Sequence, residues 1–154
     1  GDNEPFIYGL YAESEEDSRW LEWPVQGSNT VSLSNPFGAA KNGAVHSGID
    51  IPASQGAVIL AAADGTVKET GYDAERGNYL VLDHGDGLET VYAACRDFTV
   101  EEGDTVKAGE MIGAVGSTGM STGPHLCFQV WQDGEAQNPV AYFDSEIRAT
   151  LRAE

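Results

Sequence analysis

Residues 79–92 read Tyr79-Leu-Val-Leu-Asp-His-Gly-Asp-Gly-Leu-Glu-Thr-Val-Tyr92, and this stretch decides the fold class. Two short runs of apolar and β-branched residues, Tyr79-Leu-Val-Leu and Thr90-Val-Tyr, enclose the segment His84-Gly-Asp-Gly-Leu. β-Branched and aromatic residues favour strands, and an Asp-Gly pair between two such runs is typical of a tight hairpin turn. The stretch therefore predicts two antiparallel strands joined by a hairpin.

The same pattern continues on both sides of this hairpin. Short apolar runs separated by Gly, Asn and Asp predict further strands, and these runs are Val58-Ile-Leu-Ala, Gly65-Thr-Val, Met111-Ile-Gly-Ala-Val and Leu126-Cys-Phe-Gln-Val. After Trp23 no helical period longer than about three turns is present. We therefore predict an all-β domain of closely spaced hairpins.

Length and charge exclude several classes of protein. The 154 residues suffice for one ordinary domain. Lys and Arg number 8 against 25 Asp and Glu, a formal net charge of -17. This balance argues against a broad basic face for nucleic acid or anionic lipid. No apolar run reaches the roughly 18–20 residues that cross a bilayer, so we expect no membrane contact by this fragment itself.

The first 22 residues differ from the remainder of the chain. They hold many acids and a single base, Arg19. We expect an acidic leader segment over residues 1–22 and one domain over residues 23–154. Because the chain starts with Gly1 rather than Met, we interpret it as a trimmed fragment from which an upstream signal or anchor was removed.

Four residues that could bind a metal occur in two short motifs. His46 and Asp50 have the spacing H-x-x-x-D, and His125 is followed two residues later by Cys127. If His125 and Cys127 lie on a strand, they point to the same face, because side chains alternate along a strand. Imidazole, carboxylate and thiolate are all zinc ligands, and three of them with one open position are typical of a catalytic zinc.

A larger set of motifs resembles the lysostaphin-type (LytM-like) zinc endopeptidases of bacterial cell walls, both in the residues of each motif and in the order of the motifs along the chain. The motifs are Trp23-Pro-Val, Asn35-Pro-Phe-Gly, His46-Ser-Gly-Ile-Asp, Ala63-Asp-Gly-Thr-Val, His84-Gly-Asp-Gly, Thr90-Val-Tyr, Gly103-Asp-Thr-Val-Lys-Ala-Gly and Ser117-Thr-Gly-Met-Ser-Thr-Gly-Pro-His-Leu-Cys-Phe. The resemblance implies a compact, hairpin-rich barrel-sandwich of the duplicated hybrid motif type with an open groove. It also implies a zinc that activates water to cut peptidoglycan peptides.

Carried over position by position, the resemblance assigns His46, Asp50 and Cys127 to the metal. It assigns His125 to general base catalysis, and it makes Tyr92, Thr118 and Ser121 candidates for contacting the substrate. The sequence departs from the family at two positions. Cys127 stands where the family has the second His of H-x-H, and Ala94 stands where it has the His of Tyr-x-His.

The two departures decide the functional expectation. A positioned acid or base contributes about 10²–10⁴-fold in rate, so Ala94 alone predicts poor hydrolysis. A thiolate can hold zinc, but it makes the metal a weaker Lewis acid than imidazole does. We therefore expect a zinc site that is weakened or left empty.

Alternative roles remain for the other histidine and for the two cysteines. His84 lies in the predicted hairpin turn, where we expect a structural role. A Cys95–Cys127 disulfide is one use of the two sulfurs. However, alternation along the strand turns Cys95 away from the site, so we favour a small buried side chain at Cys95.

The sequence leaves three functions open. The first is a degenerate peptidase domain, a pseudo-enzyme that binds peptidoglycan peptide or an envelope protein in the bacterial cell envelope or outside the cell. The second is an active or weakly active zinc endopeptidase in which Cys127 replaces a His ligand. The third is a purely structural assembly module.

Overall fold

The all-β prediction is confirmed. The computed structural model describes residues 21–26, 38, 40–41, 44–45, 47–118, 124–145 and 147. Its elements are antiparallel strands and a 3-10 turn, η1, at Pro139–Tyr142. Within these ranges no helix is both long enough and apolar enough to span a bilayer. The boundary expected between residues 22 and 23 is a prediction that the structure does not test.

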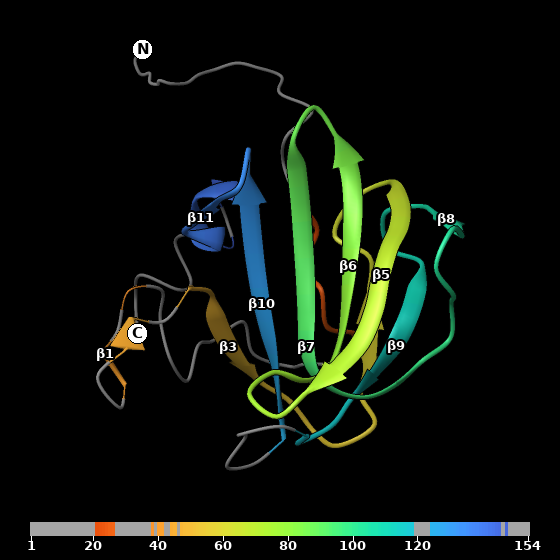
Figure 1. The fold of residues 1–154 in the computed structure, drawn as a ribbon, viewed down its shortest axis with the longest axis vertical. Helices are drawn as coiled ribbons and strands as arrows, with labels where there is room; N and C mark the ends of the chain where they lie inside the picture. The colour runs from red at the N-terminus through yellow and green to blue at the C-terminus, as the bar shows by residue number, and fades with distance from the viewer. Residues whose placement is uncertain are drawn as a thin grey trace.

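The strands form one large antiparallel sheet and one small one. Figure 1 shows β3, β10, β7, β6 and β5 side by side across the large sheet. Its strands follow the spatial order β11-β10-β7-β6-β5-β8, with β3 paired to β10, and β9 paired to both β4 and β7. The strands of the large sheet are β3 (Ile49–Pro52), β4 (Val58–Leu60), β5 (Gly65–Asp73), β6 (Gly77–Gly85), β7 (Leu88–Phe98), β8 (Thr105–Val106), β9 (Met111–Val115), β10 (His125–Gln132) and β11 (Glu135–Gln137). The small sheet pairs β1 (Ala40–Lys41) with β2 (Ala44–Val45).

The hairpin between β6 and β7 has the turn that the sequence predicts. Gly85 pairs with Leu88, so Asp86 and Gly87 form a two-residue loop. Both loop residues have positive φ, 55° at Asp86 and 83° at Gly87. This is the geometry that Asp-Gly adopts readily, and its twist matches that of the flanking strands.

The main core lies on one face of the large sheet. Tyr92 of β7 and Phe128 of β10 are fully buried, with ring centroids 5.4 Å apart, and Phe128 stacks in turn on Phe143 at 6.0 Å. A second, smaller cluster lies on the opposite face and consists of Tyr79, Val81, Val91 and Ala93, with Cys127 and Trp131 packed against it. We call the face of the sheet that carries this second cluster the site face.

Strand β7 changes its partner partway along its length. Ala93 pairs with Cys127 of β10, whereas Cys95 pairs with Val115 of β9. Ala94 lies between these two pairings, and an irregularity in the pairing of β6 with β7 occurs at the same place. Bulges of this kind re-aim side chains and are frequent beside functional sites. The strands that carry the predicted site residues therefore meet at a junction around Ala94.

Candidate functional site

Three of the predicted site residues come together on neighbouring strands. Cys127 of β10 lies directly opposite Asp50 of β3 and, on its other side, opposite Ala93 of β7. Directly opposed residues of an antiparallel pair have their Cβ atoms about 4.5–5.5 Å apart on the same face. His125 lies two residues before Cys127 on the same strand, as the alternation argument predicts. Asp50, His125 and Cys127 therefore share the site face.

His125 and Asp50 approach each other within this group. The His125 Nε2 atom lies 3.5 Å from the Asp50 Oδ1 atom. This distance is long for a hydrogen bond, so the contact is electrostatic and strengthens when the imidazole is protonated. Both side chains are largely shielded from solvent, with 18% of His125 and 10% of Asp50 exposed. An imidazole beside a carboxylate in such a place is suited to hold and release a proton.

The donors near Cys127 are chemically suited to zinc but incomplete in the described part of the chain. A carboxylate and a thiolate are both zinc ligands, and the register places Asp50 opposite Cys127. Among the described residues no three His, Cys, Asp or Glu side chains form a group that could hold a metal. The third ligand of the predicted set, His46, lies outside the described residues, as does Ser121. When bound in such a site, zinc would supply a Lewis acid and a water of lowered pKa.

Ala94, which stands where the resemblance predicts a histidine, has an unusual backbone conformation. Its φ is +64°, a left-handed conformation that is uncommon for alanine. The Ala94 amide donates to the backbone carbonyl of Arg76 at 2.8 Å, and the residue is 5% exposed. The bulge is thus held by the backbone, although a methyl group is the only side chain that it presents.

Tyr92 points into the core of the domain. We expected Tyr92 to contact substrate, but its side chain is fully buried in the main core. Its hydroxyl accepts a hydrogen bond from the Ala62 amide at 2.9 Å and lies 2.8 Å from Thr90 Oγ1. Because Tyr92 is an even number of residues from Thr90 along β7, both point into the core and away from the site face. Contact of Tyr92 with a substrate remains a prediction that the structure does not test.

The Thr118 hydroxyl is used within the protein. It accepts from the Asn78 amide at 3.1 Å and donates to the Cys95 carbonyl at 2.8 Å. These contacts tie the segment after β9 to strands β6 and β7. Contact of Thr118 with a substrate remains a prediction that the structure does not test.

Neither cysteine forms a disulfide bond in this structure. Cys95 is 1% exposed and belongs to the main core, which confirms the expectation of a small buried side chain. Burial raises the pKa of the Cys95 thiol, and the nearby Cys127 and Asp97 add to the rise. Cys127 is half-buried and packs against the site-face cluster. The disulfide alternative does not describe this structure.

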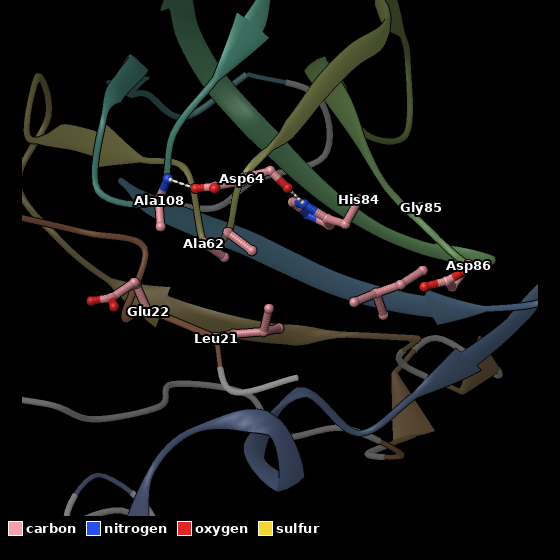
Figure 2. A pocket seen from close by; sticks show the side chains of 10 residues that line it. Leu21, Glu22, Ala62, Asp64, His84, Gly85, Asp86 and Ala108 are labelled. Atoms are coloured by element: carbon pink, nitrogen blue, oxygen red, sulfur yellow. Dashed lines mark hydrogen bonds between the residues drawn. The ribbon is translucent and has the colours of Figure 1, made fainter. Parts of the chain in front are cut away.

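A pocket that the sequence did not reveal lies at the other end of β7. Its volume is about 360 Å³, and Figure 2 shows Glu22, Asp64, His84 and Asp86 among the residues that line it. His84 Nδ1 lies 2.7 Å from the Asp64 carbonyl, and His84 Nε2 lies 2.7 Å from Thr90 Oγ1. Since both ring nitrogens are engaged in internal hydrogen bonds, the structural role expected for His84 is confirmed.

The comparisons with known proteins agree with this arrangement. A family model described as "Peptidase family M23" matches residues 44–139. These residues include β2 to β11 and the described site residues, so they define a peptidase-like domain of the lysostaphin type. The chain belongs to peptidase family M23.

Similar proteins carry names that concern peptidases or murein. The chain is 40% identical over 136 residues to the "DD-carboxypeptidase/endopeptidase Mpg" of Neisseria meningitidis serogroup B, which covers 82% of this chain and 31% of that protein. It is 38% identical over 127 residues to the "Murein hydrolase activator NlpD" of Escherichia coli, covering 81% of this chain and 31% of that protein. Among solved structures, a zinc-containing peptidase from Vibrio cholerae superposes with a TM-score of 0.70 at 30% identity, covering 79% of this chain and 38% of that one. The matched region thus spans about a third of the length of these relatives.

Proposed function

We propose that this M23 domain binds a peptide segment on its site face without efficient hydrolysis. The observation that carries this proposal is Ala94. The bulge has a positive φ and a hydrogen bond to Arg76, but the side chain at its apex is a methyl group. A methyl group can neither donate nor accept a proton, and a missing acid, base or oxyanion donor costs about 10²–10⁴-fold in rate.

Cys127 supports the same proposal through the metal. A thiolate donates more charge to zinc than an imidazole does, which weakens the polarisation of a bound water or carbonyl. The thiol must also lose its proton to bind, so the zinc site is weaker than a site built from histidines. We propose His46, Asp50 and Cys127 as the ligands of this weakened site and His125 as the remaining proton-transfer group.

The ligand is a peptide from peptidoglycan or from a protein partner in the bacterial envelope. The names of two relatives point in these two directions, one an endopeptidase and the other an activator of murein hydrolases. The net charge of -17 disfavours general adsorption to anionic wall polymers. Binding would therefore depend on specific contacts at the site face rather than on overall charge.

A second candidate is weak zinc endopeptidase activity. It is favoured by the retention of Asp50 and His125 in contact on the site face, and by the likeness to the zinc-containing peptidase from Vibrio cholerae. This candidate differs from the first in requiring turnover.

The two cysteines provide a direct test of ligand binding. In the metal-free chain, the half-buried Cys127 should react with a small alkylating reagent much faster than Cys95, which is 1% exposed. A bound peptidoglycan peptide, or a bound envelope protein in a second arm, should slow the alkylation of Cys127 specifically. Cys95 serves as the internal control, and Cys127→Ser should remove the signal.

Turnover and metal content complete the experiment. Purified peptidoglycan incubated with the zinc-loaded chain should release no more peptide than the no-enzyme control, and zinc should be lost on dialysis against a chelator. Rapid release of peptide would replace the proposal with the second candidate. Unchanged alkylation of Cys127 in both arms would refute binding at the site face.

A further inference from the structure

A continuous chain of hydrogen bonds joins three separate segments behind the site face. It runs from the Ala62 amide to Tyr92 Oη at 2.9 Å, from Tyr92 Oη to Thr90 Oγ1 at 2.8 Å, and from Thr90 Oγ1 to His84 Nε2 at 2.7 Å. The other ring nitrogen, His84 Nδ1, lies 2.7 Å from the Asp64 carbonyl. The chain therefore connects the loop between β4 and β5 at both Ala62 and Asp64 to strands β6 and β7.

The fixed donors and acceptors at the two ends assign every proton in this chain for a neutral His84. A carbonyl only accepts, so His84 Nδ1 carries a proton and donates to Asp64. The Ala62 amide only donates, so Tyr92 Oη accepts from it. If His84 is neutral, its unprotonated Nε2 accepts from the Thr90 hydroxyl, so the hydrogen bond between the two hydroxyl groups is then donated by Tyr92. With a neutral His84, every polar hydrogen in the chain has an acceptor.

Protonation of His84 breaks this closed arrangement. A protonated Nε2 donates to Thr90 Oγ1, so the Thr90 hydroxyl can no longer donate to His84. The Thr90 hydrogen then has an acceptor in Tyr92 Oη only if the Tyr92 hydroxyl stops donating to Thr90. In either arrangement, one hydroxyl hydrogen of Thr90 or Tyr92 is left without an acceptor among the described residues. Both side chains are fully buried, so solvent does not replace the lost bond. Leaving a buried donor unsatisfied is costly.

The acidic residues around His84 favour its protonated form, in opposition to the hydrogen-bond chain. Burial lowers the pKa of His84 below its ordinary value of 6.5, while the hydrogen bond to the Asp64 carbonyl and the charges of Asp83, Asp64 and Glu89 raise it. His84 lines the pocket described above and also a second, neighbouring pocket. Together these pockets bring the charged residues Glu22, Asp86 and Lys107 near His84. The acidic neighbours thus favour protonation, and burial together with the closed hydrogen-bond chain opposes it.

We propose that the chain from His84 to Ala62 is an acid-labile latch that holds the loop between β4 and β5 against the sheet. It is closed while His84 is neutral in its Nδ1–H form, and it opens when His84 takes up a proton. Tyr92 directly precedes the bulge at Ala93 and Ala94, so the latch also anchors the strand that forms the floor of the site. The role is independent of what the site face binds.

Nitrogen NMR on the full chain tests the latch without any substitution. At neutral pH the His84 ring should show the Nδ1–H tautomer, and it should titrate below its ordinary pKa of 6.5. The protection of the Ala62 amide from hydrogen exchange, corrected for the intrinsic pH dependence of exchange, should fall over the same pH range. An Nε2–H tautomer, or Ala62 protection that is unchanged while His84 titrates, would overturn the proposal.

A matched pair of variants at Thr90 tests the chain directly. Thr90→Ala removes the hydroxyl and leaves space for water, which can donate or accept, so the pKa of His84 should rise. Thr90→Ser keeps the hydroxyl, and the pKa should stay low. Tyr79→Phe is the control, because the Tyr79 hydroxyl bonds Glu69 on the opposite face. Equal titration of His84 in the Thr90→Ala and Thr90→Ser variants would refute the latch.

Discussion

Restoring the two missing histidines is the sharpest test of the proposed loss of catalysis. The change is the pair Ala94→His and Cys127→His, made singly and together. The backbone at position 94 suits the first change, because histidine is among the residues enriched at positive φ, and the φ there is already +64°. The hydrogen bond from position 94 to Arg76 uses the main chain, so it survives the substitution.

The expected magnitudes follow from what each position contributes. Cys127→His replaces a thiolate opposite Asp50 with the ligand that the family uses, so zinc should bind more tightly while hydrolysis stays near background. Ala94→His alone supplies an imidazole beside a weak metal site and should also give little turnover. Together, the two changes should raise the cleavage rate by about 10²–10⁴-fold over either single variant. Since both act on one site, their effects should be strongly non-additive.

The assay is release of soluble peptide from purified peptidoglycan, with zinc content measured for each variant by mass spectrometry. A matched control is Glu89→His combined with Cys127→His, which adds an imidazole near the start of the same strand β7, away from Cys127, and should not restore cleavage. Thermal unfolding of each variant checks that the 5% exposed position 94 accepts the larger side chain. The reasoning is refuted if the unmodified chain cleaves as fast as the double variant, or if Cys127→His alone is sufficient.

Three further predictions concern the packing of Gly48 against strand β10, the affinity for zinc, and the dependence of stability on pH. Gly48→Ala should destabilise the fold by about 1–3 kcal/mol in chemical denaturation, because its Cβ would lie 2.4 Å from the Phe128 carbonyl oxygen; an unchanged midpoint would contradict this. Zinc affinity, measured by competition with a chelator, should rise with pH because Cys127 must release a proton, and Cys127→Ser should flatten that dependence. The lowered pKa of His84 means that the unfolded chain binds more protons than the folded one below 6.5. Stability should therefore be lost as pH falls from 6.5 through the lowered pKa, and His84→Gln should show a smaller loss.

Local sequence patterns predicted those features that depend on neighbours in the chain. The Asp86-Gly87 turn requires positive φ at two successive residues, which the sequence signals by itself. The shared face of His125 and Cys127 follows from alternation along one strand. Strand β5 was predicted too short, because its polar residues after Val67 resemble a loop until their pairing with β6 is known.

Features that depend on long-range pairing could not be predicted in the same way. The pairing of Asp50 with Cys127 joins positions far apart in sequence, and no local pattern sets that register. The bulge at Ala94 arises because β7 exchanges β10 for β9, which is a property of the whole sheet. The burial of the Tyr92 ring could not be predicted from its motif, because alternation from the bulge turns the ring into the core.

The way in which the junction is held would explain how the domain keeps its fold after the loss of the two histidines that we propose. Asp50, Ala93 and Cys127 are placed by the main-chain pairing of β3, β7 and β10, and Ala94 by its amide bond to Arg76. None of these contacts needs a metal or an imidazole. The large apolar side chains that support them, such as Phe128, lie on the opposite face of the sheet. We therefore expect a substitution at a proposed metal ligand to reduce catalysis without changing the shape of the site face, and a surface of unchanged shape can still bind the proposed peptide.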